Sequence, residues 1–258
     1  MSLRNKIKEH SNNKAHKVFI WINFTFLFLS FFNASSTLGQ IQDYKGSIYL
    51  GIRNSQVKSD VDNIPLELPI GMGSAFGLGL TKPIYGDYHI GLGLEAGIFN
   101  LRVRPEDHPF SELAHQFYYI HIPLYIQRVF PISYRFSIMA RSGISLNALV
   151  SSLGEISGTN LDNGSELTLK LRRNIMPMPG ILFSAGLDYD LMSGSTLTFC
   201  IFWNPVLFAQ LNMDYTYQVP EENVTYSGTL WSQTGGLGCS LILNFNVSAL
   251  FVSPNDWP

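Results

Sequence analysis

The residue types that could carry out nucleophilic chemistry gather in one short stretch of this chain. Ser111 and Glu112 lie between His108 and His115, so a hydroxyl, a base and a carboxylate are all available there. Such a group could cleave or transfer an acyl ester if the side chains met in the right geometry. No G-x-S-x-G elbow surrounds Ser111. The stretch therefore favours a solvated loop with incidental histidines, and catalysis is the weaker alternative.

Other kinds of site receive less support. The stretches 71–77 and 91–97 are rich in glycine, but neither has the G-x-G-x-x-G spacing or opens a helix, so no nucleotide site is expected. The chain has 2 cysteines, and no spaced ligand cluster predicts a metal or another cofactor. Cys200 and Cys239 fall on opposite faces of neighbouring predicted strands, so we expect no disulfide between them.

A small set of titratable residues stands alone in stretches that are otherwise apolar or rich in glycine and serine. Its members are Glu95, His121, Arg141 and Asp188. An unpaired buried charge is costly, so a carboxylate in an apolar interior has to be paired. We expect Arg141 to pair with Glu95 or Asp188. The set is predicted to be a structural plug rather than a path for protons or solutes.

The elements that must position these residues show an alternation of period two, which is typical of β-strands. Large apolar residues alternate with glycine, serine or an isolated polar group. The predicted strands are 46–53, 72–81, 88–99, 118–127, 136–147, 181–190, 196–211 and 237–245. Most are as long as the roughly 9 to 11 residues of a tilted membrane strand. Pro123 lies in the middle of the fourth strand, and because proline lacks an N–H donor we expect a bulge or kink there.

The connections between these strands alternate in length. The short ones are 84–87, 130–133 and 191–195, and the long ones are 54–70, 102–115, 151–175 and 212–226. An even number of strands with short turns at one end and long loops at the other is typical of a bacterial outer-membrane barrel. The sequence therefore predicts an all-β fold, an eight-stranded antiparallel up-and-down transmembrane β-barrel.

The polarity of the two strand faces favours a membrane barrel over a soluble one. A lipocalin-like barrel fills its interior with apolar side chains, whereas here the few charged residues share a face with glycine and serine. Aromatic residues also gather at the short turns, as at Tyr85, Phe130 and Tyr134, where a membrane interface would favour them. We therefore expect the large apolar face to contact outer-membrane lipid.

Composition agrees with this reading. Only 14% of the residues are charged and 46% are hydrophobic, which is little charge for a surface in contact with water. The net charge is -2 and no basic stripe is present, so nucleic acid is not an expected partner.

The N-terminal segment is expected to be removed. Basic residues precede an apolar run at 18–32, and a small polar tract follows at 33–40, which is the order of a secretory signal peptide. The run is short for a spanning helix, which needs about 20 apolar residues. We predict a signal peptide at 1–39 and a barrel domain at 40–258.

Residues 119–127, YIHIPLYIQ, resemble the fourth-strand consensus of the outer-membrane β-barrel family of the PorT and OmpA/OmpX-like type, common in Bacteroidetes. His121 stands where that family usually has Glu, and Gln127 where it usually has Lys. The stretches 141–147 and 179–189 are similar to its fifth and sixth strands. The resemblance covers roughly 44–246 and implies an architecture rather than an activity, since members include secretion accessories and adhesins.

Taken together, these features predict a non-enzymatic, porin-like barrel protein of the cell envelope with a structural, accessory or surface-contact role. The loop 151–175 is the best surface for an envelope protein partner, because function in rigid barrels concentrates in loops. Two alternatives stay open: a lipid-modifying enzyme, a lipid A deacylase or acyltransferase with its site at the barrel rim, and a soluble periplasmic binding barrel. A wide pore is not expected from eight strands.

Overall fold

The structure is a computed structural model in which the described residues lie between Tyr44 and Val247. It leaves out 1–43, 60–64, 107–112, 151–153, 160–163, 174–176, 192–193, 208, 210, 221–222, 234–235 and 248–258. The signal peptide expected at 1–39 lies outside the described residues. No helix within the described part of the chain is long and apolar enough to cross a membrane.

Nearly all of the described chain is β-strand. The strands are β1 (Lys45–Ser59), β2 (Leu66–Glu67), β3 (Gly71–Tyr85), β4 (Tyr88–Pro105), β5 (Leu113–Pro131), β6 (Phe136–Leu149), β7 (Glu155–Thr159), β8 (Glu166–Arg173), β9 (Met178–Asp190), β10 (Thr196–Trp203), β11 (Leu211–Val219), β12 (Val224–Gln233) and β13 (Leu237–Asn246).

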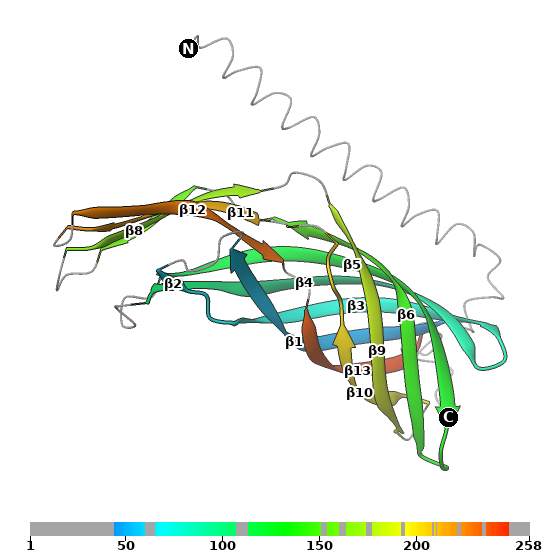
Figure 1. Cartoon of the computed structure of the whole chain (residues 1–258). Helices are drawn as coiled ribbons and strands as arrows, with labels where there is room; N and C mark the ends of the chain where they lie inside the picture. The colour runs from blue at the N-terminus through cyan, green and yellow to red at the C-terminus, as the bar shows by residue number, and fades with distance from the viewer. Residues whose placement is uncertain are drawn as a thin grey trace, which may run out of the picture. The chain divides into compact units, whose positions relative to one another are not determined.

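Eight of these strands close into an antiparallel barrel, which confirms the predicted fold class (Figure 1). Its order is β1, β3, β4, β5, β6, β9, β10 and β13, and β13 returns to pair with β1 from Lys45↔Asn246 to Arg53↔Gly238. Each predicted strand corresponds to one member. The seventh ends at Trp203 rather than at 211, and Pro205 follows, a residue that cannot donate to a strand ladder.

A second sheet grows from the barrel at the end opposite the short turns. Its order is β12, β11, β8 and β7, and β12 joins it to the barrel by pairing with β1 from Gln56↔Gln233 to Ser59↔Leu230. Two of the predicted long connections, 151–175 and 212–226, contain strands of this sheet, which the sequence pattern did not predict. The stretches 54–59, 102–105 and 113–115 continue β1, β4 and β5. We call this sheet, together with β2 and those three strand ends, the cap (Figure 1).

The cap has its own apolar core. Side chains of β8, β11 and β12 pack against those of β4 from Phe99 to Val103 and of β5 from Phe117 to Tyr119. Members of this core that are at most 1% exposed are Phe99, Leu101, Val103, Phe117, Tyr119, Leu169, Leu211, Met213, Tyr217 and Leu230. The opposite face of the cap sheet is polar. Arg172 on β8 and Asp214 on β11 form an ion pair there at 2.6 Å.

The barrel buries a different set of side chains in its lumen, the space enclosed by the eight strands. The buried polar residues there include Ser47, Arg53, Thr81, His121, Arg141, Ser145, Asn147, Asp188, Thr198 and Asn204. Large apolar side chains point outward instead. Examples that are between 38% and 57% exposed are Leu50, Ile52, Phe76, Leu78, Leu94, Leu124, Ile126, Phe199, Leu241 and Leu243. The sorting predicted from the alternation is confirmed for the barrel.

Pro123 sits in the ladder without the predicted bulge. The register of β4 with β5 is unbroken from Leu92↔Leu124 to Glu95↔His121, and only the pairs at Gly93 and Leu94 drop out. Gly93 explains the fit, because a Cβ there would lie 2.9 Å from Cγ of Pro123. A residue without a side chain makes room for the ring, so the strand loses a hydrogen bond and keeps its register.

Candidate functional site

The candidate site is the polar cluster in the lumen. Register brings its first two members together, since Glu95 on β4 is the direct cross-strand partner of His121 on β5. Arg53 reaches Glu95 from β1 across the intervening strand β3. Gly77 of β3 pairs with Glu95, and a Cβ at Gly77 would lie 2.6 Å from Cγ of Glu95. The glycine therefore leaves the space through which the two charges meet.

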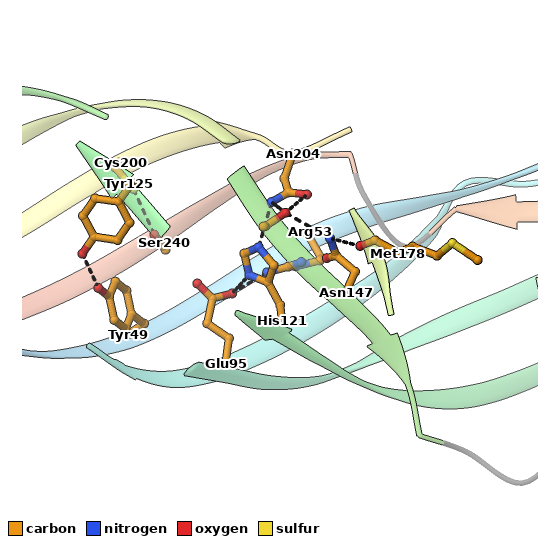
Figure 2. Close-up of polar contacts among 11 residues, drawn as sticks. Tyr49, Arg53, Glu95, His121, Tyr125, Asn147, Met178, Cys200, Asn204 and Ser240 are labelled. Atoms are coloured by element: carbon orange, nitrogen blue, oxygen red, sulfur yellow. Dashed lines mark hydrogen bonds and ion pairs between the residues drawn. The ribbon is translucent and has the colours of Figure 1, made fainter. Parts of the chain in front are cut away.

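Glu95 is the acceptor at the centre of the cluster (Figure 2). Its Oε2 accepts from Nη2 of Arg53 at 2.6 Å and contacts Nδ1 of His121 at 2.9 Å. Nε2 of His121 lies 2.8 Å from Nδ2 of Asn204, which can only donate. His121 thus accepts at Nε2 and donates at Nδ1, so its ring is held as one tautomer between an amide and a carboxylate.

The cluster continues to the start of the cap. Nδ2 of Asn204 donates to Oγ of Ser145 at 3.1 Å, and Nδ2 of Asn147 donates to the same oxygen at 3.0 Å. Arg53 lies over the rings of Tyr119 at 4.7 Å and Phe202 at 5.3 Å. Its side chain is only 2% exposed, so its charge is balanced inside the protein by Glu95 and by the two ring faces.

The four residues singled out from the sequence do not form one network. Glu95 and His121 are in contact, whereas Nε of Arg141 donates to Oε1 of Gln127 at 2.8 Å and its guanidinium lies 4.8 Å from the ring of Tyr125. Among the described residues, no ion pair joins Arg141 to Glu95 or Asp188, so the predicted pairing was wrong. Asp188 accepts from Oγ1 of Thr198 at 2.6 Å. Arg53 occupies the place that was expected for Arg141.

Two further polar contacts fill the lumen towards the short turns (Figure 2). The hydroxyls of Tyr49 and Tyr125 lie 2.9 Å apart. Sγ of Cys200 lies 3.0 Å from Oγ of Ser240. Cys239 pairs in register with Ile201 and takes the other face, and both cysteines are free. The absence of a disulfide was predicted correctly, and for the stated geometric reason.

A small cavity lies among these residues. Its volume is about 30 Å³, and its lining includes Arg53, Glu95, Arg141, Tyr125 and Cys200. A space of this size and polarity holds a water molecule or two rather than an organic ligand. No group of three metal-ligating side chains occurs among the described residues. The arrangement can hold charges in a fixed place inside the barrel, and it offers no nucleophile next to a base.

Most of the predicted nucleophilic stretch lies outside the described residues, namely His108, Ser111 and Glu112. His115 lies on β5 and its ring meets that of Phe117 edge-on at 4.7 Å, in a structural contact.

The sequence reasoning missed Arg53 and Asn204. Arg53 has the same strand parity as Ser47 and Tyr49, which marks it as a lumen residue, but it was placed at the end of the first strand. Asn204 lies just after β10. It shares the parity of Thr198 and Cys200 in the predicted strand 196–211, but it carries no charge and was not included in the predicted polar set.

No family model matches the chain, and no curated protein does. Among solved structures, the outer membrane protein OprG from Pseudomonas aeruginosa is 11% identical with a TM-score of 0.48, over 79% of this chain and 95% of that one. Neisserial surface protein A is 11% identical with a TM-score of 0.43, over 79% and 97%. These likenesses carry nothing about ligands or activity.

Proposed function

We propose that this chain is a non-enzymatic outer-membrane protein whose barrel spans the bilayer and whose cap stands in water outside the cell. The observation that supports this most strongly is an inversion of polarity along single strands. On β4, the outward positions change from Leu92, Leu94 and Ile98 to Asn100 and Arg102. Side chains along β4 continue to alternate between the outward and the inward face without a break. The change in polarity therefore occurs on both faces at the same level.

The inward face of β4 changes in the opposite sense at the same place. Gly93, Glu95 and Gly97 face the lumen, and the next inward residues are Phe99 and Leu101, each 1% exposed. Water on the outside requires an apolar interior, whereas hydrocarbon on the outside permits a polar one. On β4 the inward face changes from polar or small residues to large apolar ones within two residues. A strand that passes from hydrocarbon into water would need this change.

Strands β1 and β5 change at the same height as β4. Register links Arg53 on β1 to Gly73 on β3, Gly73 to Phe99 on β4, and Phe99 to Phe117 on β5. Just beyond Arg53, the outward residues of β1 change from Ile52 to Asn54. On β5 the inward residues change from His121 to Tyr119 and Phe117. Strand β3 keeps Met72 outward at this level, 59% exposed. The common level on β1, β4 and β5 supports a boundary shared by three strands rather than a local feature of one.

The distance from the short turns to this level fits a bilayer. The outward face of β4 is apolar or aromatic from Tyr88 to Ile98, close to the roughly 9 to 11 residues of a tilted spanning strand. The lumen between the two ends is filled by side chains such as Arg53, Tyr49 and Tyr125. A filled lumen favours a structural or surface-contact role over transport, and the polar outer face of the cap is the surface that a partner would meet.

Carbonate extraction of cell envelopes tests the proposal. The chain is expected to stay in the membrane pellet with the outer-membrane fraction, while a soluble periplasmic protein followed as a control is released. Release of the chain with that control would overturn the membrane assignment and favour a soluble barrel. Export through a signal peptide at 1–39 stays a prediction, and N-terminal sequencing of the protein in the pellet would test it.

A further inference from the structure

The outward face of the barrel carries basic side chains at one end only, next to the short turns. Lys82 on β3 and Arg128 on β5 have outward parity, as do the apolar residues above them. Arg135 lies in the turn between β5 and β6. If the proposed function is right, this end of the barrel lies at the periplasmic leaflet of the outer membrane, and these groups lie at the depth of its headgroups.

Each of these basic groups lies against aromatic side chains. The guanidinium of Arg128 is 5.0 Å from the ring of Tyr88 and 4.6 Å from that of Phe130. Nζ of Lys82 is 5.2 Å from the ring of Tyr44. These rings favour the boundary between hydrocarbon and headgroups, and their faces hold the cations there without neutralising them.

Arg135 is held by the neighbouring pair of strands. Its Nη1 donates to the hydroxyl of Tyr189 at 3.3 Å, and the ring of Tyr189 lies 5.1 Å from that of Phe136. Three basic groups on one rim are therefore each supported by aromatic rings from their own or adjacent strands. We call Lys82, Arg128 and Arg135, with these rings, the basic rim.

The basic rim has no carboxylate partner among the described residues. None of the described outward strand positions at this end is Asp or Glu. Asp87 contacts His89 through its main-chain oxygen, and Asp190 accepts from Oγ1 of Thr196. The contrast with the cap is direct, because Arg172 there is paired with Asp214. Basic groups without a protein counter-ion at the depth of the headgroups can take an anionic one from the membrane.

We propose that the basic rim binds the phosphates of an anionic phospholipid, phosphatidylglycerol, in the leaflet next to the short turns. Lys82 and Arg128 stand on strands separated by β4, about 10 Å apart, so each takes its own phosphate. The guanidinium of Arg128 can bind a phosphate through two N–H groups. The ammonium of phosphatidylethanolamine would be repelled by the same cations, so the rim discriminates between the two headgroups.

The test uses the full chain reconstituted in nanodiscs of equal amounts of phosphatidylglycerol and phosphatidylethanolamine. Native mass spectrometry then counts the lipids that stay bound. The wild-type chain is expected to retain phosphatidylglycerol in preference, and Arg128→Gln to weaken that retention about fivefold, the effect of one basic side chain near an anionic surface. The triple variant with Lys82→Gln and Arg135→Gln should lose the preference. Lys170→Gln, an equal charge change on the cap, should leave it intact.

Two results would overturn the basic rim. One is equal retention of both lipids by the wild-type chain, and the other is an unchanged preference in the triple variant. Vesicle flotation separates these results from a failure of the proposed function. A chain that floats with vesicles but retains both lipids equally overturns the lipid site alone, whereas a chain that does not float overturns the site and the membrane assignment together.

Discussion

The barrel and the cap share strands β1, β4 and β5 but sort their side chains in opposite ways. The barrel keeps Arg53, Glu95 and His121 inside and turns leucine and isoleucine outward. The cap keeps Val103 and Leu169 inside and turns charged and hydroxyl side chains outward. The hydrogen-bonded ladder runs through both, so the backbone does not decide the difference. Under the proposed function the surrounding medium decides it, because a face must match the solvent that it meets.

This difference makes the two regions respond differently to the same kind of substitution. Interior contacts in the barrel are hydrogen bonds and ion pairs, which fail when one partner is removed. Interior contacts in the cap are packed apolar surfaces, which fail when volume is lost. Exterior positions follow the reverse rule, with charge excluded from the apolar middle of the barrel wall and tolerated on the cap.

The largest effect is expected from Glu95→Ala. This change leaves Arg53 buried beside Nδ1 of His121 without the shared carboxylate. Removing one partner of a buried pair typically costs about 3 to 5 kcal/mol. Urea unfolding in lipid vesicles, followed by tryptophan fluorescence, measures the loss. Glu155→Ala is the control, because that carboxylate is exposed on the cap and its removal should cost less than about 0.5 kcal/mol. Equal losses of stability in the two variants would contradict the claim that buried ion pairs stabilise the barrel interior.

Leu169→Ala tests packing in the cap. Leu169 is fully buried, so truncation should cost roughly 2 to 5 kcal/mol, the transfer free energy plus that of the cavity. Limited proteolysis should cut the cap while the barrel stays intact. The matched change, Leu50→Ala, removes the same atoms from an outward position that is 57% exposed. Lipid chains fill the vacated space there, so a smaller loss is expected, and a larger one would be evidence against lipid on that face.

Leu78→Arg places a charge on the outward face of the barrel, where the side chain is 53% exposed. In a bilayer the cost should be about 2 to 4 kcal/mol, since arginine is that unfavourable near the midplane of a membrane barrel. Thr229→Arg puts the same group on the exposed outer face of β12 and should change stability by less than about 0.5 kcal/mol. The free energy of unfolding of both variants is measured in the same vesicles. Equal losses would contradict a difference in medium between the outward face of the barrel and the outer face of the cap.

The smallest effect is expected at the two cysteines. Cys200 is buried in the lumen and Cys239 lies on the outward face of β13, which the proposed function places in lipid. A water-soluble maleimide should therefore label neither thiol in the folded chain in vesicles, and both after unfolding. The double variant Cys200→Ala, Cys239→Ala should fold with a loss of about 1 kcal/mol or less, a common value for a mild substitution. Rapid labelling of the folded chain would show that one of these walls is open to water.

The barrel was predictable from the sequence because each of its strands repeats one simple rule. Leu92 and Leu94 alternate with Gly91 and Gly93, and the same rule recurs in every wall strand. The cap was missed because the rule reverses there. In the stretch Phe99 to Arg104 the alternation continues, but the charged residues now take the outward positions. A search for continued alternation with opposite polarity would have extended β4 and revealed β8 and β11.

The sequence predicted which strand face carries the polar cluster, but not which side chains in it form hydrogen bonds and ion pairs with one another. Parity placed Glu95, His121 and Arg141 in one interior, yet it could not say which cation meets Glu95. That choice depends on the stagger of strands β1 and β4 across the glycines of β3, a property of the closed barrel and not of any one strand. Asn204 lies outside the regular strands, so only the three-dimensional arrangement brings it to His121.

Cysteine scanning along the outward face of β4 tests the inversion most directly. Single cysteines are introduced into the cysteine-free chain in the outer membrane of intact cells, which are then treated with a membrane-impermeant maleimide. Leu94→Cys and Ile98→Cys should stay unlabelled because lipid covers them. Asn100→Cys and Arg102→Cys should react, giving a step between residues 98 and 100. Equal labelling at all four positions, or labelling confined to the first two, would contradict a membrane surface at this level.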